Sequence, residues 1–390
     1  MPETTQTPHI TINNTRSRLK RLSWALAVIK WAAIAAAALA VAGFAFVKFD
    51  TAAAAEITDA YLRPLFGDKL VVAVEQVFFN LSDSANRVIY SYDFKKPVAP
   101  QFIRGNPLPD QTGLDLTPIP PNPAFSPLSG EGAWNSIPLS AFPGRTVLAY
   151  TFIRPDSSRS FAIVSVVKAD TSALTLGSVA GTVEPGGKVG KFGPGRVPRE
   201  IAQSGRLVAA FDGGFQYRDG AYGMIVGNTT YLPLKPGLGT IVGLADGTVK
   251  IVSYTGQDFG KANFIRQNGP MLIEHGSIVV ANEDSQKVWG RVIGAQMFTW
   301  RSGIGITRHG NLLFAAGNNL NPLTLAQALA AAGATDAIQL DINPHWVRFN
   351  VFNYRGGGQY DSYPLNKEMA DGAKEYLNGY QKDFFYLYKK

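Results

Sequence analysis

The sequence predicts a β-rich domain of the α+β or mixed α/β class, a single catalytic-type domain with few helices. Short apolar runs typical of strands recur from residue 146 to the C-terminus, with glycine and proline turns about every ten residues. Only two stretches of this region have the signals of a helix. Hydrophobic residues make up 46% of the 390 residues and charged residues 17%, as expected for a folded protein with a sizeable core.

Residues 24–47 are predicted to anchor the chain in a lipid bilayer. This stretch is apolar except for Lys30, and at about 1.5 Å per residue it spans a bilayer core of roughly 30 Å. A basic tail at residues 1–22 precedes the predicted anchor at residues 23–48, which favours a cytoplasmic N-terminus. We therefore expect a single-pass membrane protein whose main domain is extracytoplasmic. A cleaved signal peptide is the alternative, because residues 51–55 are small and offer a processing site.

Residues 49–96 are predicted to form membrane-proximal helices. Apolar residues recur at helical spacing from position 56 to position 79, and Pro64 and Gly67 interrupt the pattern. The sequence therefore predicts two short amphipathic helices in this region.

Residues 97–145 are dense in proline. Such a segment is extended and semi-rigid, and serves as a spacer or as a strap along the surface of a domain. Trp134 and Phe142 near its end favour docking onto the domain that follows, which we place at residues 146–390.

The elements of this domain follow from apolar runs and from turn residues. The predicted strands are Thr146–Ile153, Phe161–Lys168, Leu174–Val179, Leu207–Phe211, Tyr222–Val226, Thr248–Ser253, Met271–Ile273, Ser277–Val280, Leu312–Ala316, Ala337–Asp341 and Phe384–Tyr388. One predicted helix is Leu325–Ala332, with Thr324 as N-cap and Gly333 after its end, and the other is Asn366–Leu377.

The composition excludes several classes of site. The chain has no cysteine, which rules out disulfides, thiolate metal sites and thiol nucleophiles. Its net charge is +8, yet basic runs with interleaved aromatic residues are absent from the region after residue 48, so no nucleic-acid partner is expected. The glycine-rich segment Gly186–Phe192 lacks the spacing of a phosphate-binding loop, and Phe192 stands where that loop needs Ser or Thr. We interpret it as a surface loop.

Two acidic residues that close apolar runs, Asp212 and Asp341, are the first candidates for a functional site. A strand that ends in a carboxylate delivers charge to the edge of a sheet, where α/β proteins bind ligands. Two polar, glycine-rich junctions lie between them in the chain, Gln267–Pro270 and Arg301–Gly305. Ordinary β-turns are the alternative, because Asp-Gly and Asn-Gly are common turn dipeptides.

Four segments, in this order, resemble motifs of the phosphodiester glycosidase family. They are Phe211–Phe215, similar to the family's Asn-Gly-Gly-Phe; Gln267–Leu272, similar to Gln-Asn-Gly-Pro-Leu-Leu; Arg301–Ile306, similar to Arg-Thr-Ala-Ile-Gly; and Asp336–Asp341 with the helix before it, similar to Leu-x-x-Leu-Gly-x-x-Asp-Ala-x-x-Leu-Asp. The resemblance covers about residues 146–390. It implies a hydrolase acting on a sugar-1-phosphodiester or a related cell-envelope glycan, and its bacterial relatives are exopolysaccharide-related.

The resemblance also implies roles for the matching residues. Hydrolysis of such a diester needs a cation at the phosphate and a carboxylate at the anomeric carbon. Arg301 is predicted to bind the phosphate, because a guanidinium pairs with it in a bidentate fork. Asp341 is predicted to act as base, nucleophile or electrostatic stabiliser, and Asp212 as its partner acid. Two carboxylates in one site would push their pKa values apart.

Further residues are predicted to line the site. If the chain stays extended after Asp341, side-chain alternation places Asn343 and His345 beside the carboxylate, where His345 would act as an acid or contact the phosphate. The predicted substrate-binding residues are Gly213, Gly214, Phe215, Asn268, Gly269, Ser302 and Asn343.

Two departures from the family pattern leave other functions open. Asp212 stands where the family has Asn, and Ile342-Asn343-Pro344-His345 replaces a Gly-Gly and a small hydroxyl residue that would let a substrate approach the backbone. The alternatives are a non-catalytic envelope protein that binds a glycan or phosphate polymer, and a scaffold for exopolysaccharide export. No cofactor is firmly implied. A divalent cation, Ca²⁺ or Mg²⁺, is left open, although no loop has a recognisable ligand spacing.

Overall fold

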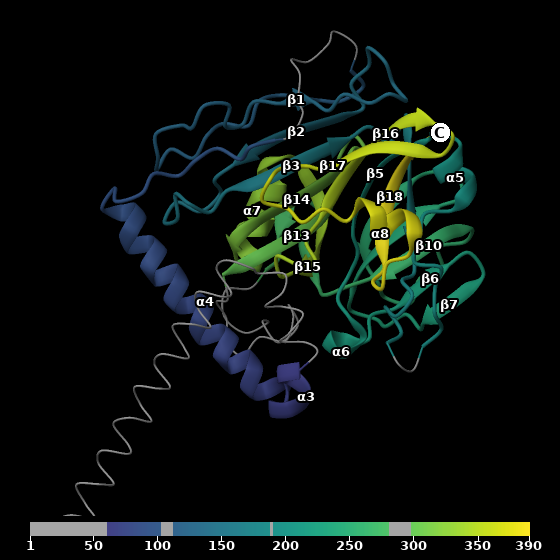
Figure 1. The fold of residues 1–390 in the computed structure, drawn as a ribbon, viewed down its shortest axis with the longest axis horizontal. Helices are drawn as coiled ribbons and strands as arrows, with labels where there is room; N and C mark the ends of the chain where they lie inside the picture. The colour runs from purple at the N-terminus through teal and green to yellow at the C-terminus, as the bar shows by residue number, and fades with distance from the viewer. Residues whose placement is uncertain (1–60, 103–111, 188–189, 281–297) are drawn as a thin grey trace, which may run out of the picture. The chain divides into compact units, whose positions relative to one another are not determined.

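The computed structural model describes residues 61–102, 112–187, 190–280 and 298–390. Across these ranges it has three sheets, whose strands pair antiparallel, and six helices (Figure 1). The predicted β-rich domain with few helices is confirmed, and its antiparallel pairing is typical of the α+β class. The predicted tail and anchor lie outside the described residues. None of the helices that the structure describes has both the length and the apolar character needed to cross a membrane.

The largest sheet has eight strands in the order β1-β2-β3-β14-β13-β15-β11-β12. Its strands are β1 (Asn135–Ser136), β2 (Leu148–Ile153), β3 (Val164–Ala169), β14 (Leu312–Leu320), β13 (Thr299–Thr307), β15 (Ala334–Ile342), β11 (Met271–Glu274) and β12 (Ser277–Ile278). Both β13 and β15, which carry predicted site residues, lie inside this sheet. Most of their residues are buried, and both strands pair with a neighbour at each edge.

Two five-stranded sheets complete the architecture, with the orders β7-β6-β10-β8-β9 and β17-β16-β5-β18-β4. The first contains β7 (Thr229–Leu232), β6 (Met224–Val226), β10 (Ala262–Gln267), β8 (Gly239–Leu244) and β9 (Val249–Ser253). The second contains β17 (Gln359–Pro364), β16 (Phe349–Gly356), β5 (Leu207–Asp212), β18 (Phe384–Lys389) and β4 (Leu174–Val179). The predicted strands are thus present, with their ends shifted by a few residues.

Sequence reasoning missed strands whose apolar runs are diluted by glycine or polar residues. These are β7, β8, β10, β16 and β17. The segment Arg301–Gly305, expected to be a glycine-rich junction, lies in the middle of β13. Its glycines have a packing role, because a Cβ on Gly303 would lie 3.1 Å from side-chain atoms of Leu325 and Leu329 in the helix that covers the strand. Glycine therefore marks close approach here, and not a turn.

The helices are α3 (Arg63–Phe66), α4 (Asp68–Ser91), α5 (Arg199–Gln203), α6 (Tyr217–Gly220), α7 (Pro322–Ala331) and α8 (Ala373–Asn378). The predicted interruption of the first pair falls at Gly67, and α4 extends well beyond the predicted end. Asn321, and not Thr324, is the N-cap of α7, because a capping box joins their side chains and Pro322 occupies the first turn. The predicted helix Asn366–Leu377 is shortened to α8, since Asn366 accepts hydrogen bonds in a turn from the N–H groups of Glu368 and Met369.

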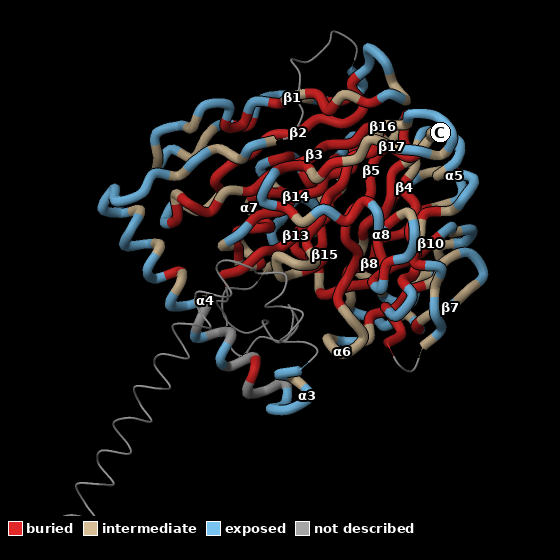
Figure 2. Tube along the Cα trace, in the orientation of Figure 1, coloured by how far each residue is buried: buried red, intermediate tan, exposed pale blue. Residues whose placement is uncertain are grey.

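The core is concentrated in the strands, as Figure 2 shows. One apolar cluster draws residues from all three sheets, including Phe211, Phe264 and Phe314. A second cluster combines α7 with the described part of the proline-rich strap, where Trp134 is buried and its indole N–H donates to the backbone carbonyl of Thr117. The three sheets therefore pack as one body, and their strand ends are fixed relative to one another.

Candidate active site

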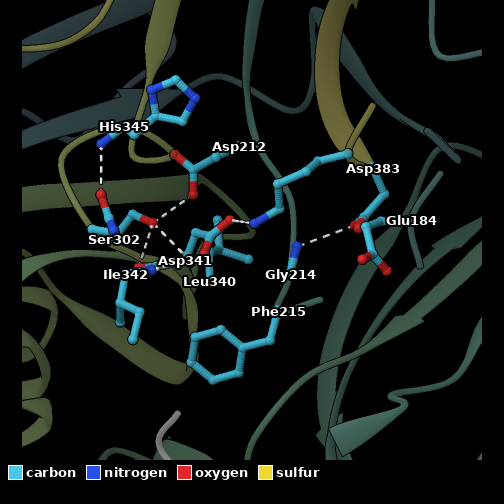
Figure 3. Close-up of polar contacts among 12 residues, drawn as sticks. Glu184, Asp212, Gly214, Phe215, Ser302, Leu340, Asp341, Ile342, His345 and Asp383 are labelled. Carbon is cyan, nitrogen blue, oxygen red and sulfur yellow. Dashed lines mark hydrogen bonds and ion pairs between the residues drawn. The ribbon is translucent and has the colours of Figure 1, made fainter. Parts of the chain in front are cut away.

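Three polar side chains meet where β5, β13 and β15 approach one another. Asp212 is the last residue of β5, Ser302 lies in β13, and Asp341 is the next-to-last residue of β15. The Ser302 hydroxyl donates a hydrogen bond to Oδ2 of Asp212 at 2.5 Å and accepts one from the backbone N–H of Asp341 at 3.0 Å (Figure 3). Both aspartates are almost excluded from solvent, with exposures of 1% and 3%. One serine therefore connects the two acidic residues that the sequence singled out.

A buried lysine compensates the charge of one of these carboxylates. Nζ of Lys382 forms an ion pair with Oδ2 of Asp341, and Oδ1 of the same carboxylate accepts the N–H of Ile342 at 2.9 Å. Lys382 lies two residues before β18 begins and is 1% exposed. Its Nζ also lies 4.8 Å from the centre of the Trp346 ring. The C-terminal part of the chain thus supplies a cation to the site.

The chain turns directly after Ile342, the last residue of β15, and does not continue as a strand. Asn343 has a left-handed φ of 89°, its Oδ1 accepts the N–H of His345 at 2.9 Å, and its carbonyl accepts the N–H of Trp346 at 3.1 Å. Asparagine tolerates this backbone conformation, and Pro344 favours a turn at the next position. The extended chain that this prediction for Asn343 and His345 required is therefore absent, and the catalytic role of His345 stays a prediction.

The turn delivers a backbone group to the other carboxylate. The N–H of Arg348 donates to Oδ1 of Asp212 at 2.9 Å. The guanidinium of Arg348 is held in turn by the carbonyl of His345 at 3.0 Å and by an ion pair with Glu375. The segment that departs from the family pattern therefore positions a donor on Asp212.

The two carboxylates have different electrostatic environments. Burial raises the pKa of Asp212 to about 8, and the nearby charge of Asp341 adds to this effect, whereas the hydrogen bonds from Ser302 and Arg348 oppose it. Burial also raises the pKa of Asp341, but the charge and hydrogen bond of Lys382 limit that pKa to about 6. At neutral pH, Asp212 is therefore mainly protonated and Asp341 mainly ionised. This is the arrangement of an acid beside a base.

The backbone of Gly213, Gly214 and Phe215 packs against a second buried ion pair. Nε of Arg266 lies 2.8 Å from Oδ2 of Asp383, and Nη2 lies 3.0 Å from Oδ1. Asp383 also accepts the N–H of Gly214 at 3.1 Å, and Arg266 donates to the carbonyl of Phe215 at 3.0 Å. A Cβ on Gly213 would lie 2.3 Å from Oδ2 of Asp383. Glycine is required here by protein groups, and a role in contacting substrate stays a prediction.

Asn268 ties the end of β10 to the site. Its Nδ2 donates to the carbonyls of Gln339 and Leu340, both at 2.7 Å, and its Oδ1 accepts the N–H of Phe215 at 3.0 Å. The neighbouring Gly269 accepts the N–H of Gly239 through its carbonyl at 2.8 Å. Asn268 therefore fixes β15 relative to the segment after β5, next to both carboxylates.

Arg301 is adjacent to Ser302 in β13, and hydrogen bonds hold its guanidinium to β14 and β15. Nε donates to the carbonyl of Leu320 at 2.9 Å, and Nη1 donates to Oε1 of Gln339 at 3.0 Å. Burial lowers the pKa of Arg301 to about 9. The structure thus joins Asp212, Ser302 and Asp341 in one group and gives Arg301 contacts with other residues. Its predicted binding of phosphate stays a prediction.

Sequence reasoning missed Lys382, Asp383 and Arg348. The signal was present, because Lys382-Asp383 is a charged pair directly before the apolar run Phe384–Tyr388. A pattern of acidic residues at the ends of apolar runs does not include a charged residue that precedes a run. In an antiparallel sheet, however, the start of one strand lies beside the end of its neighbour. Phe384 pairs with Asp212 in this way, which brings the preceding lysine to the site.

The described part of the chain has no cluster of side chains suited to bind a metal ion. Among these residues no group of three or more His, Asp and Glu is arranged to hold a metal ion. Glu184 is a further buried carboxylate near the site, as Figure 3 shows, and burial raises its pKa. Its Oε2 accepts the N–H of Tyr217 at 2.8 Å.

A site with one protonated and one ionised carboxylate is typical of a glycoside hydrolase, and comparison with known proteins agrees with this class. Residues 205–341 match the phosphodiester glycosidase family, which confirms the resemblance inferred from the sequence. This match supports a phosphodiester glycosidase-like hydrolase domain that includes residues 205–341. The matched segment includes Asp212, Ser302 and Asp341 and ends before Arg348 and Lys382. No curated protein sequence matches the chain significantly.

Solved structures that match this chain have low sequence identity to it. The catalytic domain of zebrafish N-acetylglucosamine-1-phosphodiester α-N-acetylglucosaminidase, auto-inhibited by its pro-peptide, is 14% identical, with a TM-score of 0.41 over 66% of this chain and 88% of that one. A hypothetical protein from Synechocystis is 13% identical, with a TM-score of 0.37 over 64% and 63%. A putative exported protein from Burkholderia pseudomallei is 12% identical, with a TM-score of 0.26 over 58% and 74%.

Proposed function

We propose that this protein is a membrane-anchored, extracytoplasmic hydrolase that cleaves a sugar-1-phosphodiester in a cell-envelope glycan. The observation that carries this proposal is the buried Asp212–Ser302–Asp341 group within the segment that matches the phosphodiester glycosidase family. The apolar run at residues 24–47 supports the anchor. The sugar chemistry follows from the family's activity, which cleaves the bond between a sugar carbon and a phosphodiester oxygen.

The two carboxylates have the protonation states that this reaction needs. Water attacks the anomeric carbon, and Asp341 accepts the proton of that water or stabilises the positive charge that develops on the sugar. The bond between the anomeric carbon and the phosphate oxygen breaks, and Asp212 gives its proton to that leaving oxygen. The products are the free sugar and a phosphate monoester. Ser302 holds the acid and the base in a fixed relation throughout.

The direct test is the release of sugar by the full-length protein in detergent. The substrates are sugar-1-phosphate methyl diesters that differ in the sugar, and both products are quantified. We expect free reducing sugar and methyl phosphate in equal amounts, and no methanol, because the bond that breaks is on the sugar side of the oxygen. Asp341→Asn is expected to lower the rate roughly 10²–10⁴-fold. Asp336→Asn, in the same strand but paired with the exposed His275, is the matched control and should keep the wild-type rate.

Three results would contradict the proposal. Methanol without free sugar would place the cleavage at phosphorus and remove the glycosidase chemistry. No turnover of any diester, together with retained binding of a phosphate polymer, would favour the non-catalytic envelope protein. Affinity for none of these compounds, with co-purification of membrane partners, would favour an export scaffold.

A further inference from the structure

Lys382 has donors to spare in a buried setting. An ammonium group has three N–H donors, and in the described part of the chain Asp341 is the one hydrogen-bond acceptor of Lys382. The face of the Trp346 ring lies beside the same nitrogen. A lysine that is 1% exposed and uses one donor of three is suited to hold a second anion in the same place.

The other buried cations around the site are held by several protein groups each. Arg266 forms a bidentate pair with Asp383 and donates to three backbone carbonyls as well. Arg348 is held by His345 and Glu375, and Arg301 by Leu320 and Gln339. Moving any of these guanidinium groups onto a ligand would break two or more buried contacts. Moving the ammonium group of Lys382 would break one hydrogen bond, the one to Asp341.

The backbone that carries Lys382 is fixed by Gly181–Glu184, the segment before the glycine-rich run Gly186–Phe192. The N–H of Thr182 donates to the carbonyl of Tyr380 at 2.9 Å, and the N–H groups of Val183 and Glu184 donate to the carbonyl of Gln381 at 3.0 and 2.9 Å. A Cβ on Gly181 would lie 2.4 Å from the backbone carbonyl carbon of Lys382. The two segments therefore pack backbone against backbone, and the lysine side chain alone is left to move.

We propose that Lys382 binds the phosphate of the substrate, and that Asp341 and the phosphate compete for its ammonium group. The proposal rests on the proposed function for the identity of the substrate. It adds a catalytic residue from outside the segment that matches the family. Without substrate, Lys382 neutralises Asp341. When a diester binds, the ammonium turns to the phosphate oxygen, and the Asp341 carboxylate is released to act at the anomeric carbon.

Competition for one cation makes a prediction that an ordinary structural ion pair does not make. Removing the carboxylate should strengthen the binding of phosphate, because Lys382 then loses the carboxylate that accepts its hydrogen bond. Removing the lysine should abolish it. Both effects concern binding alone, so they are measured without turnover.

The experiment measures the binding of inorganic phosphate and of dimethyl phosphate to the full-length protein by titration calorimetry. We expect Asp341→Asn to bind both ligands at least about tenfold more tightly than the wild type, a difference of about 1.4 kcal/mol. Lys382→Met should show no binding. Lys390→Met removes an exposed lysine next to the same strand and should bind like the wild type.

A double variant keeps the test decisive if a single variant fails to fold. Lys382→Met leaves Asp341 buried without its partner, which is costly. Lys382→Met combined with Asp341→Asn removes both charges, so it should unfold near the wild-type temperature and still bind neither ligand. Phosphate binding by this double variant would overturn the proposal. Equal or weaker binding by Asp341→Asn would also overturn it, since no competition would then exist.

The outcome is separable from that of the proposed function. If the wild type releases no sugar but the variants bind phosphate in the expected order, the anion site stands and the reaction is wrong. If sugar is released but Lys382→Met, or the double variant, binds phosphate like the wild type, the reaction stands and another residue holds the phosphate.

Discussion

The hydroxyl of Ser302 and the carboxylate of Asp212 lie 2.5 Å apart across the boundary between two sheets. Ser302 belongs to the eight-stranded sheet, and Asp212 ends a strand of a five-stranded one. The same hydroxyl oxygen accepts the backbone N–H of Asp341. This serine therefore fixes the spacing between the protonated and the ionised carboxylate. A change in the packing of the two sheets would alter that spacing.

Ser302→Ala tests this coupling. The substitution removes a hydrogen bond that favours the ionised form of Asp212, so the pKa of Asp212 should rise further. It also leaves the N–H of Asp341 without its acceptor. A buried donor left unpaired costs about 1–3 kcal/mol, which corresponds to a loss of kcat/KM of roughly 5–150-fold. Ser178→Ala, at a buried serine whose hydroxyl donates to the carbonyl of Phe384, is the control and should retain activity.

The pH dependence of kcat/KM should be bell-shaped, with its maximum near pH 7. Asp341 must be ionised, so activity falls as the pH drops below its pKa of about 6. Asp212 must be protonated, so activity falls as the pH rises above its pKa of about 8. Each unit beyond these values should cost about tenfold. The residual activity of Asp212→Asn should lack the alkaline limb, since an amide does not titrate, and an alkaline limb that persists in this variant would assign it to another group.

The sequence predicted the two carboxylates because both stand at the end of apolar runs. That pattern is local, since it consists of a short apolar strand followed by an acidic residue. It can therefore be recognised without knowing the tertiary contacts. The surroundings of Arg301 were not predictable in this way, because register shifts on both sides of the residue change which neighbours its side chain meets. The turn at Asn343 depends on a left-handed residue, and the arrival of Lys382 depends on the pairing of β18 with β5. These features are set by tertiary contacts, which a local pattern does not contain.

Arg301→Lys separates a structural role of this residue from phosphate binding. A lysine has one nitrogen and does not reproduce the fork that reaches both Leu320 and Gln339. Each buried acceptor left unpaired costs roughly 1–3 kcal/mol, so the urea midpoint should fall. Phosphate affinity in the Asp341→Asn background should not change. A loss of phosphate affinity with an unchanged urea midpoint would instead show that Arg301 binds the phosphate. Arg355→Lys, at an exposed ion pair, is the control for the chemical change.

The predicted membrane topology is testable because the chain has no cysteine. A single cysteine introduced at Ser17, in the predicted cytoplasmic tail, or at the exposed Lys250 is the only thiol present. In intact cells a membrane-impermeant maleimide should label Lys250→Cys and leave Ser17→Cys unlabelled until the cells are lysed. Labelling of both positions in intact cells, or of neither, would contradict an anchor at residues 24–47 with an extracytoplasmic domain.

The buried pair of Arg266 and Asp383 should be the most stabilising ion pair near the site, because neither charge reaches solvent. Their side chains are 1% and 0% exposed, and Asp383 also holds the N–H of Gly214. Asp383→Asn should lower the free energy of unfolding by about 3–5 kcal/mol, since it leaves a guanidinium buried without its anion. At the exposed pair of Arg355 and Asp361, Asp361→Asn should cost under about 1 kcal/mol. Urea unfolding at constant pH measures both effects. Equal costs would show that water reaches Arg266, and the fixed position of Gly214 beside the carboxylates would then need another cause.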